Sequence, residues 1–201
     1  MSKPFFEVFP NLQLNTDIHD LMGQTEVERV SATKRRDFLR VYLKSTRLIQ
    51  KADIWTAEQE IKKQWFPAAN LTVKIYEKFE LSSQYNPEKL MDIYKESILE
   101  EFREYSHIQY NALKTAKIEY PAENEVLITM EDTVLNRSME GEILQILEKI
   151  LVERCGFSVK VHAAYVEKET GRFKEEEEAK IRMKVDAIYS RTRGRKEEAV
   201  D

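Results

Sequence analysis

Hydrophobic residues recur along the chain at two spacings, and these spacings predict helices and strands in turn. Near the start, the pattern predicts a short helix that Asn15 or Thr16 caps and Gly23 ends. Alternation of apolar and polar residues then predicts two strands within VERVSATKRRDFLRVYLKS, joined by a polar turn near residues 33–37. This stretch should therefore form a half-buried hairpin.

A second helix and a closing strand complete the first part of the chain. We expect Asp53 or Thr56 to open the helix and Pro67 to stop it. Its inward stripe has helical spacing and consists of Ile54, Ala57, Ile61 and Trp65. NLTVKIYEKFEL alternates as a strand. The pattern over residues 1–81 predicts a first domain with the order α-β-β-α-β.

A polar stretch, SSQYNPEKL, opens a second pattern that continues to residue 167. It predicts a helix, a short helix capped by Ser106, and two strands on either side of PAEN. A turn of helix at residues 133–137 should precede a helix that Ser138 caps and Gly156 ends, before a last strand. We summarise residues 82–167 as a second domain with the order α-β-β-α-α-β.

The sequence thus predicts an α+β protein with two small α/β sandwich domains and a charged tail. Residues 168–201 have little apolar periodicity, and we expect a charged linker toward a further domain outside this chain. The chain has 201 residues, of which 42% are hydrophobic and 34% charged, so it can bury a real core.

Charge is distributed unevenly among these three segments. The net charge is +2 over residues 1–81, −7 over 82–167 and +1 over 168–201. The middle segment should therefore repel nucleic acid at long range, and we expect DNA binding to be weak or absent. A single cysteine, Cys155, cannot form an internal disulfide, and no long apolar segment occurs. These features predict a cytoplasmic protein, and we expect a monomer.

Enzyme chemistry finds little support in the sequence. The three histidines are scattered, and none has a second ligand at metal-site spacing. No phosphate-binding, dinucleotide-binding or nucleophile-elbow motif occurs. We therefore assign no catalytic, metal or cofactor residue, and expect no cofactor.

Two features of the first domain are candidate contacts for a partner or for DNA. The hairpin carries basic residues with one tyrosine among them: Lys34, Arg35, Arg36, Arg40, Tyr42, Lys44 and Arg47. They could meet DNA or an acidic partner, or form a solvated strand face that protects the sheet edge. Trp55 lies off the inward stripe, where it could anchor an interface or pack against its own hairpin.

Four blocks of the sequence resemble a known family. KPFFEVFPNLQL, SSQYNPEKLMDIYKESILEEF, MEDTVLNRSM and ILEKILVERCGFSVKV resemble the N-terminal region of the PolC-type DNA polymerase III alpha subunit of Gram-positive bacteria. The resemblance implies a non-catalytic front end, whereas the full-length protein that the chain resembles is a DNA polymerase with 3'-5' exonuclease. It also implies that the first domain resembles the polymerase-binding domain of the clamp-loader tau subunit, and the second a type II KH fold.

KH modules bind single strands through a GxxG loop between two helices. Here the equivalent crossing is LNRSMEGE, whose only glycine is Gly141. We expect Glu140 and Glu142 to occupy the helix N-terminus, where they would repel a phosphate. The alternatives at this crossing are nucleic-acid binding and ordinary helix capping.

The sequence thus leads to a protein-protein interaction module of the replisome, whose expected partner is the clamp-loader tau subunit or another replication protein. The alternative is a single-stranded nucleic-acid-binding accessory domain that uses the basic hairpin. A passive folding or solubility segment is the third hypothesis.

Overall fold

The computed structural model describes residues 2–167 and Met183. The predicted linker, residues 168–201, therefore lies outside the described residues apart from Met183. The chain divides into two units, Met1–Tyr165 and Val166–Asp201. The described residues form an α+β fold with two small sheets, as the pattern predicts. The predicted boundary between residues 81 and 82 stays a prediction.

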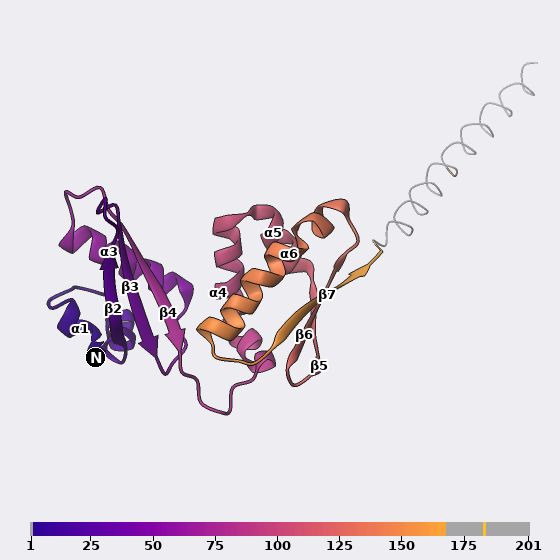
Figure 1. Cartoon of the computed structure of the whole chain (residues 1–201), viewed down its shortest axis with the longest axis horizontal. Helices are drawn as coiled ribbons and strands as arrows, with labels where there is room; N and C mark the ends of the chain where they lie inside the picture. The colour runs from indigo at the N-terminus through magenta and orange to yellow at the C-terminus, as the bar shows by residue number, and fades with distance from the viewer. Residues whose placement is uncertain (1, 168–182, 184–201) are drawn as a thin grey trace, which may run out of the picture. The chain divides into compact units, whose positions relative to one another are not determined.

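The first sheet is built from four strands with a crossover helix. Its elements are β1 (Lys3–Pro4), α1 (Phe5–Val8), α2 (Thr16–Gly23), β2 (Glu26–Ala32), β3 (Phe38–Ser45), α3 (Lys51–Trp65) and β4 (Thr72–Phe79). The strand order is β1-β2-β3-β4, as Figure 1 shows in part. The β1–β2 and β2–β3 pairs are antiparallel, whereas β3 and β4 run parallel because α3 carries the chain back between them. The sequence pattern shows neither β1 nor α1.

Local hydrogen bonds explain where the first elements begin and turn. The Asn15 side chain accepts a hydrogen bond from the Ile18 amide at 2.8 Å, which confirms it as the cap of α2. The predicted turn near residues 33–37 also forms: the Arg36 amide donates to the Thr33 carbonyl at 2.9 Å. Arg36 adopts φ 56°, in the left-handed region that a tight turn requires.

Helix α3 begins earlier than predicted, and the reason lies in another helix. Its first residue is Lys51 rather than a residue at or after Asp53, and its N-cap residue Gln50 makes no side-chain cap. The Lys51 amide instead donates to the Ser97 hydroxyl of α4 at 3.0 Å. A distant residue thus satisfies one of the amides that a helix N-terminus leaves open. At the other end, Trp65 is 40% exposed, so its predicted place on the inward stripe is wrong.

The second sheet has three strands and is accompanied by helices. The elements are α4 (Pro87–Tyr105), α5 (His107–Thr115), β5 (Lys117–Ala122), β6 (Glu125–Glu131), α6 (Val134–Glu148), the π-helix η1 (Lys149–Arg154) and β7 (Lys160–Val166). The strand order is β5-β6-β7, and Figure 1 shows α4, α5 and α6 gathered on one side of this sheet. Asn86 and Ser106 cap α4 and α5 through the Lys89 and Gln109 amides.

Between β6 and β7 the expected pair of helices is a single continuous helix. The Thr133 hydroxyl caps α6 by accepting from the Asn136 amide at 3.0 Å. Ser138 lies within the helix and donates its hydroxyl hydrogen to the Leu135 carbonyl, so its predicted role as a cap is wrong. The observed order of the second part is α-α-β-β-α-β, with the π-helix extending α6, rather than α-β-β-α-α-β.

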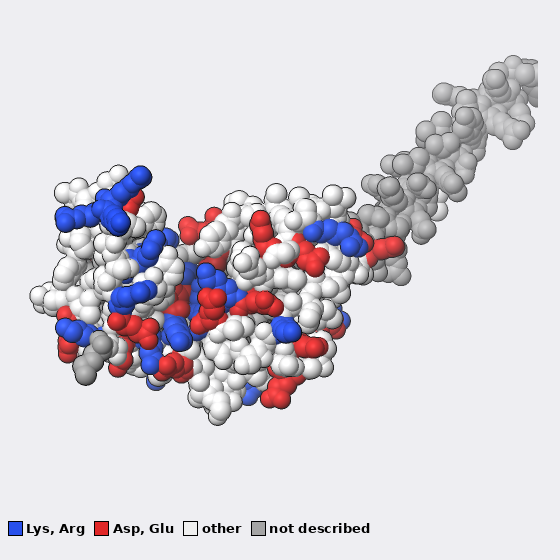
Figure 2. Space-filling model, in the orientation of Figure 1, with Lys and Arg blue, Asp and Glu red and all other residues white. Residues whose placement is uncertain are grey.

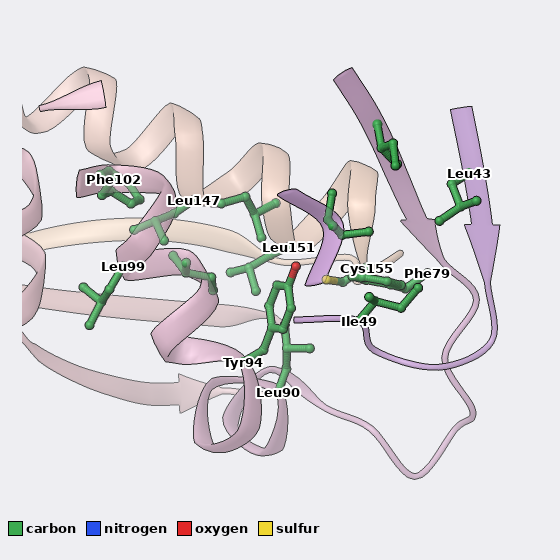
Figure 3. Packing of buried hydrophobic residues seen from close by; sticks show 14 of the residues in the cluster. Leu43, Ile49, Phe79, Leu90, Tyr94, Leu99, Phe102, Leu147, Leu151 and Cys155 are labelled. Atoms are coloured by element: carbon green, nitrogen blue, oxygen red, sulfur yellow. The ribbon is translucent and has the colours of Figure 1, made fainter. Parts of the chain in front are cut away.

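The buried core joins the inward faces of both sheets to the helices. Phe79 of β4 and Tyr94 of α4 meet edge to face, with ring centroids 5.7 Å apart. Figure 3 shows Tyr94 among apolar side chains that include Leu90 and Leu151. Gly156 ends η1 with φ +76°, as the sequence predicts for a helix terminator. The apolar contacts between α4 and β4 mean that the two sheets share packing within Met1–Tyr165.

Candidate interaction surface

The face of the first sheet that points away from its buried core gathers basic and aromatic residues. On β3, Val41 and Leu43 are buried, so Arg40, Tyr42 and Lys44 lie on the opposite, outward face. On β4 the outward positions are Lys74, Tyr76 and Lys78, and the parallel register pairs each with its counterpart on β3. We call these six residues and Arg29 of β2 the outward sheet face.

Three planar groups of this face stack across three neighbouring strands. The Arg29 guanidinium lies 4.1 Å from the centroid of the Tyr42 ring. On the other side of Tyr42, the Tyr76 ring lies at a centroid distance of 5.3 Å and an interplanar angle of 20°. Cation–π contact and ring stacking are both favourable, so the three groups fix one another's orientation. Tyr76 nevertheless remains 49% exposed.

Some of the positive charges on this face are partly neutralised. Lys44 pairs with Glu80 at 2.8 Å, and this hydrogen bond raises the pKa of Lys44. Lys74 lies 3.5 Å from Glu58 of α3. Within the part of the chain that the structure describes, neither Arg40 nor Lys78 forms an ion pair. The outward sheet face therefore keeps free cations on both of its long strands.

The turn between β2 and β3 extends the positive charge beyond the sheet. Arg35 and Arg36 are both exposed there, and Lys34 beside them is exposed too. Figure 2 shows Lys and Arg side chains gathered at the end of the first sheet where this turn lies. The structure thus brings Arg40, Tyr42 and Lys44 onto one face and leaves Arg35 and Arg36 at its end.

Trp55, the remaining predicted contact residue, lies elsewhere. It is half-buried on α3, beside Ile54, which is fully buried on the inward stripe. The helix packs on the buried side of the sheet, whereas Tyr42 points to the other side. Trp55 is therefore separate from the outward sheet face, and the two would have to serve different contacts.

The acidic crossing differs from its expected geometry. Glu140 and Glu142 lie in the second and third turns of α6, so the prediction that they occupy its N-terminus is wrong. Glu140 accepts a hydrogen bond from the Tyr165 hydroxyl at 2.6 Å, and Glu142 accepts from Gln109. Gly141 sits between them in a helix rather than in a loop. These carboxylates consequently link α6 to β7 and α5 through hydrogen bonds.

A buried network of four charges joins the two parts of the fold. Lys51 of α3 contacts Glu77 of β4 at 2.8 Å, and Arg154 of η1 contacts Glu77 at 3.3 Å. Arg154 also binds Glu101 of α4 through both terminal nitrogens, one of them at 2.9 Å. The two cations balance the two carboxylates, and no side chain of the four is more than 16% exposed. Such a network is costly to disrupt, since removing one member leaves a buried charge unpaired.

Two neutral groups lie against this network. Burial and the nearby charge of Glu77 raise the pKa of Tyr94, whose hydroxyl meets the geometry of no hydrogen bond among the described residues. Burial also raises the pKa of Cys155 to about 12, so its thiol stays protonated. For Arg154, burial acts to lower the pKa, but the hydrogen bond to Glu101 and the charge of Glu77 raise it overall.

Neither a membrane span nor a metal site is found in the described part of the chain. None of the described helices has the length and apolar character that crossing a bilayer requires. No group of three or more His, Cys, Asp or Glu residues among the described residues could hold a metal ion.

The sequence pattern did not identify four members of the outward sheet face, namely Arg29, Lys74, Tyr76 and Lys78. A signal was present in VKIYEK, where outward positions carry the same residue types as in LRVYLK. Recognising it required the parallel pairing of β3 and β4, which places the two tyrosines side by side. The bulge between Val27 and Arg29 also brings Arg29 opposite Tyr42, and no sequence pattern marks it.

Comparison with protein families shows a similarity over most of the first part of the fold. Residues 4–75 match the model described as DNA polymerase III polC-type N-terminus I. Over these residues the chain is similar to that family. These residues, which we call the polC-type segment, contain β2, β3, α3 and half of β4, so they include the basic hairpin and Trp55. Searches of curated proteins and of solved structures gave no match.

Proposed function

We propose that the chain is the N-terminal, non-catalytic interaction region of a replicative DNA polymerase III alpha subunit of PolC type. It docks another replisome protein in the cytoplasm, and the clamp-loader tau subunit is the first partner to test. The observation that carries this proposal is the match of residues 4–75 to a family described as a DNA polymerase III N-terminus. The polymerase and exonuclease activities would belong to parts of the full-length protein outside this chain.

Helix α3 supports a protein-docking role for the polC-type segment. It keeps two tryptophans partly accessible: Trp55 is half-buried and Trp65 is 40% exposed. Tryptophan is enriched among the residues that dominate binding energy at protein interfaces. Trp65 also meets Phe9 edge to face at 5.7 Å, so it has a packing role within the domain. Trp55 is therefore the better anchor to substitute.

Our proposal for the second part, residues 82–167, is a type II KH-like domain that lacks the GxxG loop. The three-stranded sheet and the helices beside it support this arrangement. The uninterrupted α6 at the crossing leaves no loop for a nucleotide backbone to approach. This part would then contribute to docking or to stability rather than to nucleic-acid binding at that crossing.

The test is calorimetric titration of the 201-residue chain with purified tau subunit and, separately, with other replisome proteins. We expect saturable binding to tau that weakens at least about tenfold in Trp55→Ala, as truncation of an interface anchor does. Tyr76→Ala is the matched control, since it removes an exposed aromatic side chain from the opposite side of the first sheet. If none of the replisome proteins shows saturable binding, the proposal is wrong.

A further inference from the structure

The last ring of the stack on the outward sheet face is Tyr76, and no other ring among the described residues covers its second face. Arg29, Tyr42 and Tyr76 lie on β2, β3 and β4 in that order, and β4 is the last strand of the sheet. Tyr42 covers one face of the Tyr76 ring. No other ring among the described residues stacks on Tyr76, which is 49% exposed. The stack can therefore be extended by one further planar group from solution.

The orientation of the rings decides what kind of group fits. The rings of Tyr42 and Tyr76 are nearly parallel, and the Arg29 guanidinium makes a cation–π contact with Tyr42. Tyr76 is thus held as a platform before any ligand arrives, which lowers the entropy cost of binding. A nucleobase offers a flat π surface of matching size, and base–aromatic stacking tolerates any sequence.

The charges around the platform favour an anionic chain. Lys74 and Lys78 lie two residues before and after Tyr76 on the same face, each about 7 Å away along the strand. Arg40 adds a cation on the neighbouring strand, opposite Lys74. The acidic side chains near this face are Glu26 and Glu28 by Lys44, Glu80 paired with Lys44, and Glu58 beside Lys74. Lys78 and Arg40 consequently remain available to phosphates.

We propose that single-stranded DNA binds the outward sheet face, with one base stacked on Tyr76 and the neighbouring phosphates near Lys78 and Arg40. An acidic peptide would satisfy the cations, but its carboxylates would leave the Tyr76 ring without a stacking partner. The match of residues 4–75 to a DNA polymerase III N-terminus favours DNA over RNA as the ligand. The proposal is otherwise independent of tau docking, which involves Trp55.

DNA binding on the outward sheet face differs from the expectation that DNA binding by this chain is weak or absent. That expectation rested on the −7 charge of residues 82–167 and on the acidic crossing. Both lie in the second part of the chain, whereas the outward sheet face belongs to the first, whose net charge is +2. Binding confined to one sheet face with few free cations should be moderate and sensitive to salt.

The experiment is fluorescence anisotropy of labelled oligothymidylate titrated with the 201-residue chain at low and at moderate salt. We expect binding that Tyr76→Ala weakens by about 5- to 150-fold, the range for losing one base–aromatic stack. Tyr76→Phe keeps the ring and should bind nearly as well as the unchanged chain. Lys78→Gln should make the negative slope of log affinity against log salt shallower by about 0.7, because one phosphate contact is lost. Tyr105→Ala, which removes a 74% exposed tyrosine from α4, should have no effect.

Several outcomes would overturn the proposal. Among these are no binding at low salt, equal loss in Tyr76→Ala and Tyr105→Ala, and equally tight binding of duplex DNA or polyglutamate. Tighter binding of oligouridylate would overturn the choice of DNA.

Circular dichroism checks that each variant is folded. In the unchanged chain, the NMR signals of the Tyr76 ring should shift upfield on adding oligothymidylate. Trp55→Ala should leave DNA binding intact, which separates this proposal from tau docking.

Discussion

At the scale of single residues, the effect of a side chain depends on the space and the backbone angle it is given. Gly141 and Gly156 illustrate this, since a Cβ added at either would meet no atom within 4 Å. Gly141 lies inside α6 with helical geometry, whereas Gly156 has φ +76°. Both sites therefore have room for a Cβ atom, and they differ in backbone conformation.

Alanine at these two glycines should change stability in opposite directions. Gly141→Ala should raise the free energy of unfolding by about 0.5 to 1 kcal/mol, because alanine loses less entropy in a helix. Gly156→Ala should lower it by about 1 to 2 kcal/mol, because a Cβ strains the left-handed conformation. Urea unfolding of both variants measures the difference. A change of the same sign in both would show that the assigned backbone conformations are wrong.

Cys155 provides a second prediction at this scale. Its thiol is 4% exposed and burial raises its pKa to about 12, whereas the thiolate is the reactive form. Alkylation by iodoacetamide near pH 8 should therefore be at least about 100-fold slower in the folded chain than in urea. Below about pH 12 the folded rate should rise roughly tenfold per pH unit. Glutathione under the same conditions serves as the exposed control, and folded Cys155 reacting as fast as glutathione would contradict the prediction.

At the scale of elements, α3 protects the open edge of the first sheet. Glu58 of α3 accepts a hydrogen bond from the Ile75 amide of β4 at 2.7 Å, which satisfies a donor that no further strand pairs. Burial raises the pKa of Glu58 above its ordinary value of 4.5, although the Ile75 amide and Lys74 act in the opposite direction. The folded chain thus holds this proton more tightly than the unfolded chain does.

Because the pKa of Glu58 is raised in the folded chain, protonation of Glu58 stabilises the fold at low pH. The stabilising contribution of Glu58 protonation is present below pH 4.5 and is lost as pH rises through its higher folded pKa. Glu58→Gln keeps an acceptor for the Ile75 amide without a buried charge, so this fall in stability should disappear. Urea unfolding across this pH range measures it. Glu60→Gln is the matched control on the same helix. Hydrogen bonds from Gln64 and Lys63 lower the pKa of Glu60, so its contribution has the opposite sign.

The sequence patterns predicted the ends of helices and the turns where interactions between neighbouring residues determine them. The helix capped by Asn15, the turn at residues 33–37 and the stop at Gly156 were all predicted, because neighbouring residues fix them. The start of α3 could not be predicted, since its amide is satisfied by Ser97, 46 residues away. At the crossing, Thr133 and Ser138 are both good capping residues, and only the tertiary position of α6 decides between them.

The candidate surface was predictable only in part, for the same reason. Arg40, Tyr42 and Lys44 follow from alternation within one strand. Their pairing with Lys74, Tyr76 and Lys78 depends on strand order and register, which α3 sets by carrying the chain back parallel to β3. The inward Glu77 is a further example, since alternation predicts an apolar residue there and only Lys51 and Arg154 make its burial tolerable.

At the scale of the whole molecule, the buried charges tie the two sheets together. Lys51 and Glu77 belong to the first part of the fold, while Glu101 and Arg154 belong to the second. With the packing of Phe79 against Tyr94, this network crosses the predicted boundary between the domains. Residues 1–165 should therefore unfold in one cooperative transition.

Arg154→Met tests this coupling. The substitution leaves Glu77 with Lys51 alone and removes the forked partner of Glu101, so it should cost about 3 to 5 kcal/mol of unfolding free energy. Differential scanning calorimetry should show one transition at lower temperature. Arg137→Met is the control, because Arg137 binds Asp132 with similar forked geometry on the exposed surface, where little change is expected. Two separate transitions in the unchanged chain would contradict a shared network.

The π-helical turn at Lys149–Arg154 has a consequence for how this chain tolerates insertions and deletions. The Cys155 amide reaches back five residues to the Ile150 carbonyl, so this turn holds one residue more than an α-helical turn would. Removing Val152, which is 40% exposed, would convert this turn into an ordinary α-helical turn, so the Arg154 guanidinium could still reach its two carboxylates. Removing one residue from the α-helical part of α6 would instead rotate everything after it by about 100° around the helix axis. The π-helical turn should accordingly tolerate the loss of one residue far better than the α-helix before it.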